Sequence, residues 1–354
     1  MCVPNVVLIM VSCALLSACG TSNEGFSAMV GVDLIPPLYT RMEVEDAQGI
    51  ELYFSEPVRV SVEQVYSIAP APALTVEAGM SDSPRIHFES PLEPGRRYEV
   101  DIFAFDEQGN STAVHLPFYG YNEDLPLVQI HEFTTQGSSR HPDMVELLVL
   151  EDGNLAGLTL YEGTPQDWDT QLVFPDMYVP GGTYIIVHYK PQGIESEQNE
   201  VAMDQASGGR HPDALDFWIP DGDGLTGNNG AITLTSMPAG GGIVDAVLYS
   251  NRTSDSDTRY RGFGSHRVRE MANELHLAGA WLPASTSAAA STDTAAHTHI
   301  RPEDAIDPED STATRSMNRS AQTADTNSAA DWYITATSGY SFGEANNAER
   351  YLSD

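Results

Sequence analysis

Apolar and polar residues alternate along several short segments in the first third of the chain. In residues 50–55 and 98–102, apolar side chains recur at every second position. A period of two places one face of a β-strand in a core and the other face in water. Turn residues follow at short spacing, at Pro94-Gly95 and at residues 107–110, as in antiparallel hairpins. We therefore predict that residues 33–121 form one β-sandwich.

A second series of apolar segments begins near residue 127. Turn sequences such as Gly181-Gly182 and Asn228-Asn229-Gly230 separate these segments, and no long helical pattern interrupts them. The predicted strands are residues 128–133, 145–150, 183–188, 231–235 and 243–249. The predicted fold class of the whole chain is therefore all-β, with two β-sandwiches in tandem.

Residues 251–312 interrupt the second series and are predicted to be an insertion. Residues 265–277 carry apolar side chains at helical spacing, which predicts one short amphipathic helix. Its apolar stripe consists of Val268, Met271, Ala272 and Leu275. Residues 283–299 are rich in Ala, Ser and Thr, a composition that predicts disorder. The insertion is thus expected to be partly helical and partly disordered.

The beginning of the chain has the pattern of an export signal. Residues 6–16 form an apolar run with the length of a secretory signal, too short to cross a bilayer as a helix. Small residues follow it, ending in Ala18 and then Cys19. The run Leu16-Ser17-Ala18-Cys19 resembles the lipobox of bacterial lipoproteins. That resemblance implies cleavage after Ala18 and attachment of diacylglycerol and palmitate at Cys19.

On this interpretation, residues 1–18 are a lipoprotein signal peptide and residues 19–32 are a flexible tether, rich in Gly, Ser and Asn. Gly20 follows the lipidated cysteine, which in lipoprotein sorting implies the outer membrane. The other two cysteines, Cys2 and Cys13, lie inside the signal peptide. No disulfide is therefore expected within one mature chain.

The net charge of the chain indicates which classes of molecule can bind to it. The chain has 17 Lys and Arg against 51 Asp and Glu, a formal net charge of −34. Nucleic acids bind to basic patches through counterion release, so a nucleic-acid partner is not expected. The charge favours a neutral or basic partner instead.

Two resemblances to known domains concern the predicted sandwiches. Residues 52–58, 92–98 and 106–110 together resemble the immunoglobulin-like domains of bacterial surface proteins, which act as spacers or adhesive modules. Residues 33–121 would be such a domain. The order of strands from residue 127 onward resembles a lamin-tail domain, an immunoglobulin-like sandwich attached to secreted and envelope proteins.

The lamin-tail resemblance implies how the chain ends. Residues 127–250 would be the first part of the domain, residues 313–347 its closing strands and residues 348–354 a tail. The segments that resemble its closing signals are residues 314–319, Asp325-Thr326, Asp331-Trp332 and residues 343–346. The whole arrangement resembles a spirochaetal-type lipoprotein.

One acidic loop is a candidate for Ca²⁺ binding. Asp221 and Asp223 alternate with glycines, and Asp216 precedes them. Calcium prefers six to eight oxygen ligands, several of which one such loop can supply. The spacing does not complete an EF-hand, so an ordinary acidic hairpin loop is the alternative. Apart from this loop, no cofactor is expected.

Two further patterns are candidates for chemical sites. The tripeptide His-Pro-Asp begins at His141 and again at His211, and the two copies would make a zinc or iron site if they met in space. Each copy is otherwise a loop that enters a strand. Residues 339–343 match the Gly-x-Ser-x-Gly pattern of hydrolases, but the required histidine does not follow Ser341. A final turn is the expected role of that segment.

These observations predict a non-enzymatic, lipid-anchored protein of the cell envelope that presents two β-sandwiches for binding, adhesion or scaffolding. Its expected partners are the membrane, through the lipid, and a protein or glycan ligand. Two alternatives remain open: a secreted lipid-anchored hydrolase with its site in residues 251–312, and a purely structural spacer.

Overall fold

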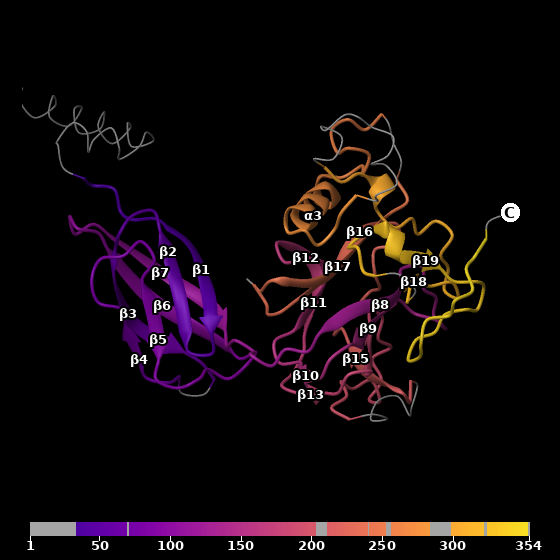
Figure 1. Ribbon diagram of the computed structural model, residues 1–354, viewed down its shortest axis with the longest axis horizontal. Coiled ribbons are helices and arrows are strands. Elements are labelled where there is room, and N and C mark those ends of the chain that lie inside the picture. Colours follow the sequence, from indigo (N-terminus) through magenta and orange to yellow (C-terminus); the bar gives the residue numbers. More distant parts are fainter. Residues whose placement is uncertain are drawn as a thin grey trace, which may run out of the picture. The chain divides into compact units, whose positions relative to one another are not determined.

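The computed structural model describes residues 33–68, 71–202, 211–239, 241–252, 256–283, 299–321 and 324–352. The chain divides into two compact units (Figure 1). Unit 1 consists of Met1–Glu93 and Arg97–Gly120, and unit 2 of Pro94–Arg96 and Tyr121–Asp354, each as far as it is described. The predicted signal peptide, Cys19 and the tether lie outside the described residues.

Unit 1 is a sandwich of two antiparallel sheets, coloured indigo to purple in Figure 1. The first sheet has the strand order β1-β2-β5-β4 and the second β3-β6-β7. The strands are β1 Tyr39–Asp46, β2 Gly49–Phe54, β3 Arg59–Tyr66, β4 Leu74–Val76, β5 Arg85–Phe88, β6 Arg97–Phe105 and β7 Ser111–Tyr119.

The core of unit 1 lies between its two sheets. Leu52 and Phe88 come from the first sheet, and Val100 and Phe118 from the second, and all four side chains are buried. Along β6, every second residue from Tyr98 onward is buried, as the alternating pattern predicts. The period of two in the sequence thus corresponds to the inward face of each strand.

Unit 2 contains a six-stranded sheet and a four-stranded sheet, with orders β15-β14-β9-β8-β18-β19 and β12-β11-β16-β17, and the small pair β10-β13. Strands β14 and β15 run parallel, and the other described pairs in this unit are antiparallel. The strands are β8 Val128–Thr134, β9 Met144–Val149, β10 Gly153–Asn154, β11 Thr159–Thr164, β12 Asp167–Val173, β13 Tyr178–Val179, β14 Tyr184–His188, β15 Ala214–Trp218, β16 Asn229–Thr235, β17 Ile243–Ser250, β18 Met317–Arg319 and β19 Trp332–Ile334. One hydrophobic core joins the two larger sheets.

The predicted helix is confirmed as α3 (His266–Leu277), shown in orange in Figure 1. Ser265 caps its first turn by accepting a hydrogen bond from the backbone N–H of Val268. The buried residues of the helix are Val268, Met271, Ala272 and Leu275, the four of the predicted stripe. The helix packs against β11 and β16 of the four-stranded sheet.

The predicted insertion also contributes to the core outside its helix. Trp281, Ile300 and Ile306 are buried in the same hydrophobic cluster as the two sheets. A short 3₁₀ helix occurs in this segment at Pro302–Asp304. Another lies beyond it, at Ala329–Asp331. The described residues of this segment are therefore part of unit 2 and do not form an appendage.

The fold class is all-β with two β-sandwiches, which confirms the prediction. Among the described residues, no helix has the length and apolar character needed to cross a membrane.

Candidate functional site

The six-stranded sheet of unit 2 carries a row of buried residues, all but one of them polar, on the face opposite the hydrophobic core. Its strand register aligns Asn318 of β18, Glu132 of β8, Glu146 of β9, Ile186 of β14 and Asp216 of β15. Residues paired in this way point to the same side of a sheet. Each of the five is at most 1% exposed. Three carboxyl groups are thus buried along one line across the sheet.

A β-bulge in β8 adds an imidazole to this face. Ile130 pairs with Leu147 and Glu132 pairs with Glu146, so His131 is an extra residue on its strand. Such an insertion lets two consecutive side chains lie on the same side. His131 Nδ1 lies 2.6 Å from Glu146 Oε1.

Residues near the end of the chain cover the row. The Ser341 backbone N–H and hydroxyl donate to the Glu132 carboxyl group, with the hydroxyl 2.7 Å from Oε2. The Gly343 N–H donates to Glu146, and the Asn346 side chain donates to the carbonyl of His131. Phe342 packs on three apolar residues of the same face, Met144, Ile186 and Ala214. The serine of the Gly-x-Ser-x-Gly segment therefore fastens the C-terminal turn to the sheet.

Burial shifts the pKa values of Glu132, Glu146 and His131. Loss of solvation raises the pKa of Glu132 to about 7, and the nearby Glu146 adds to the effect. Burial also raises the pKa of Glu146 well above its usual value and lowers that of His131 to about 4. The His131–Glu146 contact is therefore best described as a neutral pair, in which the carboxylic acid donates to the imidazole.

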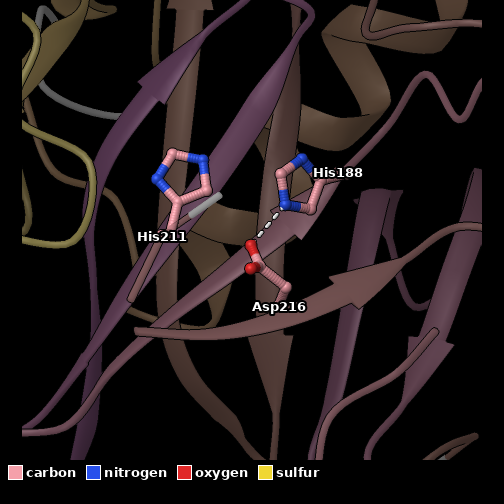
Figure 2. Close-up of side chains that lie close together, drawn as sticks. All are labelled: His188, His211 and Asp216. Atoms are coloured by element: carbon pink, nitrogen blue, oxygen red, sulfur yellow. Dashed lines mark hydrogen bonds and ion pairs between the residues drawn. The ribbon is translucent and has the colours of Figure 1, made fainter. Parts of the chain in front are cut away.

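At the β15 end of the row, two histidines and a carboxylate come together (Figure 2). His188 ends β14, Asp216 lies within β15, and His211 precedes β15. One ligand atom from each lies within 4.8 Å of the other two. His188 Nε2 is 2.6 Å from Asp216 Oδ1, the contact drawn as a dashed line in Figure 2. This donor set is one that divalent transition metals prefer.

Neighbouring groups hold these side chains in place. The indole of Trp218 stacks on the His188 ring, with centroids 3.9 Å apart and planes 12° apart. The Asp216 backbone N–H donates to the Glu200 carboxylate at 2.7 Å, and the Glu200 N–H donates to the Asp216 carbonyl. His188 and Asp216 are at most 1% exposed, whereas His211 is half-buried.

The predicted calcium loop is not assembled in the part of the chain that the structure describes. Asp216 is buried in β15 and faces His188, whereas Asp221 and Asp223 are exposed beyond the end of that strand. The three carboxylates do not form one of the ligand groups found among the described residues. The reason is that β15 continues through Trp218, so Asp216 belongs to the sheet and the other two belong to a turn.

The two His-Pro-Asp copies have different roles. His141 contacts the ring of Tyr340, and Asp143 accepts hydrogen bonds from the backbone N–H groups of Gly137 and Leu225. His211 joins His188 and Asp216 instead of the other copy. One predicted histidine is therefore in a metal-compatible group, but with partners that the tripeptide did not indicate. His188 was missed because it is the last residue of a predicted strand and belongs to no motif.

Two other features of the described residues are a carboxylate group in unit 1 and a pocket in unit 2. Asp33, Glu56 and Asp106 of unit 1 also bring their carboxylates within 4.8 Å of one another. A pocket of about 800 Å³ in unit 2 is lined by residues 191–194, 197–199 and 218–222. Trp218, which stacks on His188, is one of its lining residues.

Comparison with known proteins relates this chain to a protein of a spirochaete. An uncharacterized protein of Treponema pallidum (strain Nichols) is 29% identical over 170 residues, which cover 47% of this chain and 43% of the relative. The match therefore spans less than half of that relative. A solved structure of a DUF4876 family protein from Bacteroides thetaiotaomicron aligns with 54% of this chain and 76% of its own, at 13% identity and a TM-score of 0.23.

A family model described as the TP_1001 protein second domain matches residues 126–334. That range contains His188, His211 and Asp216, and it ends before Ser341. It spans more than half of the 354 residues, and the chain therefore belongs to the TP_1001 protein second-domain family.

Proposed function

We propose that this protein is a non-enzymatic, lipid-anchored component of the bacterial outer membrane, and that it presents two β-sandwich units for binding, adhesion or scaffolding. The observation that carries the proposal is that each unit has its own hydrophobic core. A rigid sandwich offers its loops and outer faces to partners without rearranging.

The packing of residues 251–312, as far as they are described, supports a binding or structural role over a hydrolase with its site in that segment. Ser341 lies outside that segment, and its backbone N–H and hydroxyl hold the C-terminal turn on the buried Glu132. Residues 256–283 and 299–312 pack Trp281, Ile300 and Ile306 into the core, which favours a structural role for the segment.

The assignment of unit 2 as a lamin-tail domain is part of the same proposal. Residues that carry the resemblance fasten the final strands: Asn346 donates to the carbonyls of His131 and Arg319, and Asp331 accepts from Thr326. Arg319 in turn forms a buried ion pair with Asp245 at 2.6 Å. The motif residues thus have a physical role in closing the sandwich, which supports the assignment.

The pocket of unit 2 supports a neutral or basic ligand. Gln192, Gln198 and Asn199 line it together with Trp218, and its acidic lining residues are Glu197 and Asp221. Amide side chains and an aromatic ring suit a glycan or a peptide. A strongly anionic ligand would meet the net charge of −34.

The lipid anchor is tested by metabolic labelling with radioactive palmitate in a bacterial host. We expect label in the wild-type protein and none in Cys19→Ser, because the thiol is the acylated group. Cys13→Ser is the matched control and should be labelled like the wild type. Label that persists in Cys19→Ser, or its absence from the wild-type protein, would contradict the anchored form of the proposal.

A further inference from the structure

We propose that His188, His211 and Asp216 bind one divalent transition-metal ion, of which zinc is the clearest example, at the β15 edge of the six-stranded sheet. The proposal does not depend on the envelope function. The proposed site shares Asp216 with the calcium loop predicted from the sequence. Its other two ligands are the imidazoles of His188 and His211, whereas the predicted loop had Asp221 and Asp223.

The donor set selects the class of ion. Two imidazole nitrogens and one carboxylate oxygen suit zinc and its neighbours in the first transition row. Calcium and magnesium prefer oxygen ligands, so the same group is a poor site for them. Three protein ligands leave a position for water or for a group from a bound ligand.

The distances fit an ion with little rearrangement. Bonds of about 2.0–2.2 Å at tetrahedral angles place ligand atoms about 3.3–3.5 Å apart. His188 Nε2 and Asp216 Oδ1 are now 2.6 Å apart, and the three ligand atoms lie within 4.8 Å of one another. The His188 Nε2–Asp216 Oδ1 separation must therefore widen by about 1 Å to admit the ion, a change that side-chain rotation can supply.

The backbone supplies a rigid frame for two of the ligands. Strands β14 and β15 are paired in parallel, with His188 opposite Trp218 and Ile186 opposite Asp216. The stacked indole fixes the plane of the His188 ring, and the Glu200 contacts fix the backbone at Asp216. Preorganised ligands reduce the entropy that is lost when a metal binds. His211, on the segment before β15, is the ligand with access to solvent.

The charges near the site also favour binding of a divalent cation. An isolated buried carboxylate is costly, and the Asp216 carboxylate has the His188 imidazole as its neighbour. A divalent cation with two neutral imidazoles would balance that carboxylate and retain a single positive charge. The field of a protein with a net charge of −34 attracts such an ion.

The experiment titrates the tag-free full-length protein with Zn²⁺ by isothermal titration calorimetry after removal of bound metal with a chelator. We expect a site with one ion per chain in the wild type. His211→Ala should weaken that site by about tenfold or more, because even the loss of a residue that only orients a ligand has an effect of that size. Asp216→Asn keeps the shape of the buried side chain and should weaken the site as well.

His141→Ala is the matched control, since it removes the histidine of the other His-Pro-Asp copy and should bind zinc like the wild type. Circular dichroism of each variant checks that it is folded. With Co²⁺ in place of zinc, the wild type should show the visible absorption of a site with nitrogen ligands, and His211→Ala should lose it. The proposal is overturned if the wild type binds no zinc, if His211→Ala binds it unchanged, or if His141→Ala loses as much affinity as His211→Ala.

Discussion

Glu132 lies fully buried beside a second carboxyl group, and this placement makes the stability of unit 2 depend on pH. Its pKa is raised from 4.5 to about 7 in the folded protein. A carboxyl group with a raised pKa stabilises the fold fully below pH 4.5 and loses that contribution as pH rises through 7. The neighbouring groups that also titrate or carry charge are Glu146, His131 and Arg319.

Glu132→Gln should therefore become more stable relative to the wild type as pH rises from 4.5 to 8, by up to about 3 kcal/mol. The amide stays neutral, and its oxygen and NH₂ group can replace the contacts with Ser341. Urea unfolding at a series of pH values measures the difference in the free energy of unfolding between variant and wild type. Part of that difference comes from His131, because the charge of Glu132 raises the His131 pKa. Glu123→Gln, at an exposed position, is the control. A difference that stays constant with pH would show that the pKa of Glu132 is not raised in the folded protein.

At the scale of single residues, the sequence predicted the identity of some site residues but not their partners. Asp216 and His211 were both candidates for metal binding, each with neighbours in sequence as expected companions. The structure pairs them with His188, which precedes Asp216 by 28 residues and reaches it through parallel strand pairing. Local spacing cannot show which strands pair. The bulge at His131 is hidden for a similar reason, since it appears only in the register of β8 with β9.

Helix α3 shows how much one element depends on a single buried face. Leu275 is 0% exposed and Leu277 is 86% exposed, although they are two residues apart on the same helix. Leu275→Ala should lower the free energy of unfolding by about 2–5 kcal/mol, because it removes buried apolar surface and leaves a cavity. Leu277→Ala should change it by less than about 0.5 kcal/mol. Chemical denaturation of both variants provides the measurement, and equal effects would mean that this face of the helix is not part of the core.

For helix α3, the sequence predicted the element itself but not the strands against which it packs. Its period of 3.6 and its four apolar residues were sufficient to predict the helix and its buried stripe. The pattern did not show that this stripe packs on β11 and β16. The sequence therefore predicted residues 251–312 to be an insertion. In the structure, the described residues of this segment are part of the hydrophobic core of unit 2. Replacing residues 265–312 with a flexible linker would remove part of that core as well as any surface contact.

For the whole molecule, alternation along the strands was enough to predict an all-β chain with two sandwiches. The order of strands within the sheets could not be derived in this way. Strand β18 pairs with β8, and Met317 of β18 lies opposite Phe133, far earlier in the chain. The short strands β18 and β19 have three residues each, too few for a periodic pattern. Their position depends on side-chain contacts such as the Arg319–Asp245 ion pair.

The presence of two separate cores leads to a prediction for thermal unfolding. Ile102 is buried in the core of unit 1 and Leu147 in that of unit 2, each with an exposure of 1% or less. We expect two transitions in differential scanning calorimetry, because each core is closed within its own unit. Ile102→Ala should lower the melting temperature of one transition by several degrees, and Leu147→Ala that of the other, since each substitution removes about 2–5 kcal/mol from its unit. A single transition that both substitutions shift equally would mean instead that the two units unfold as one cooperative body.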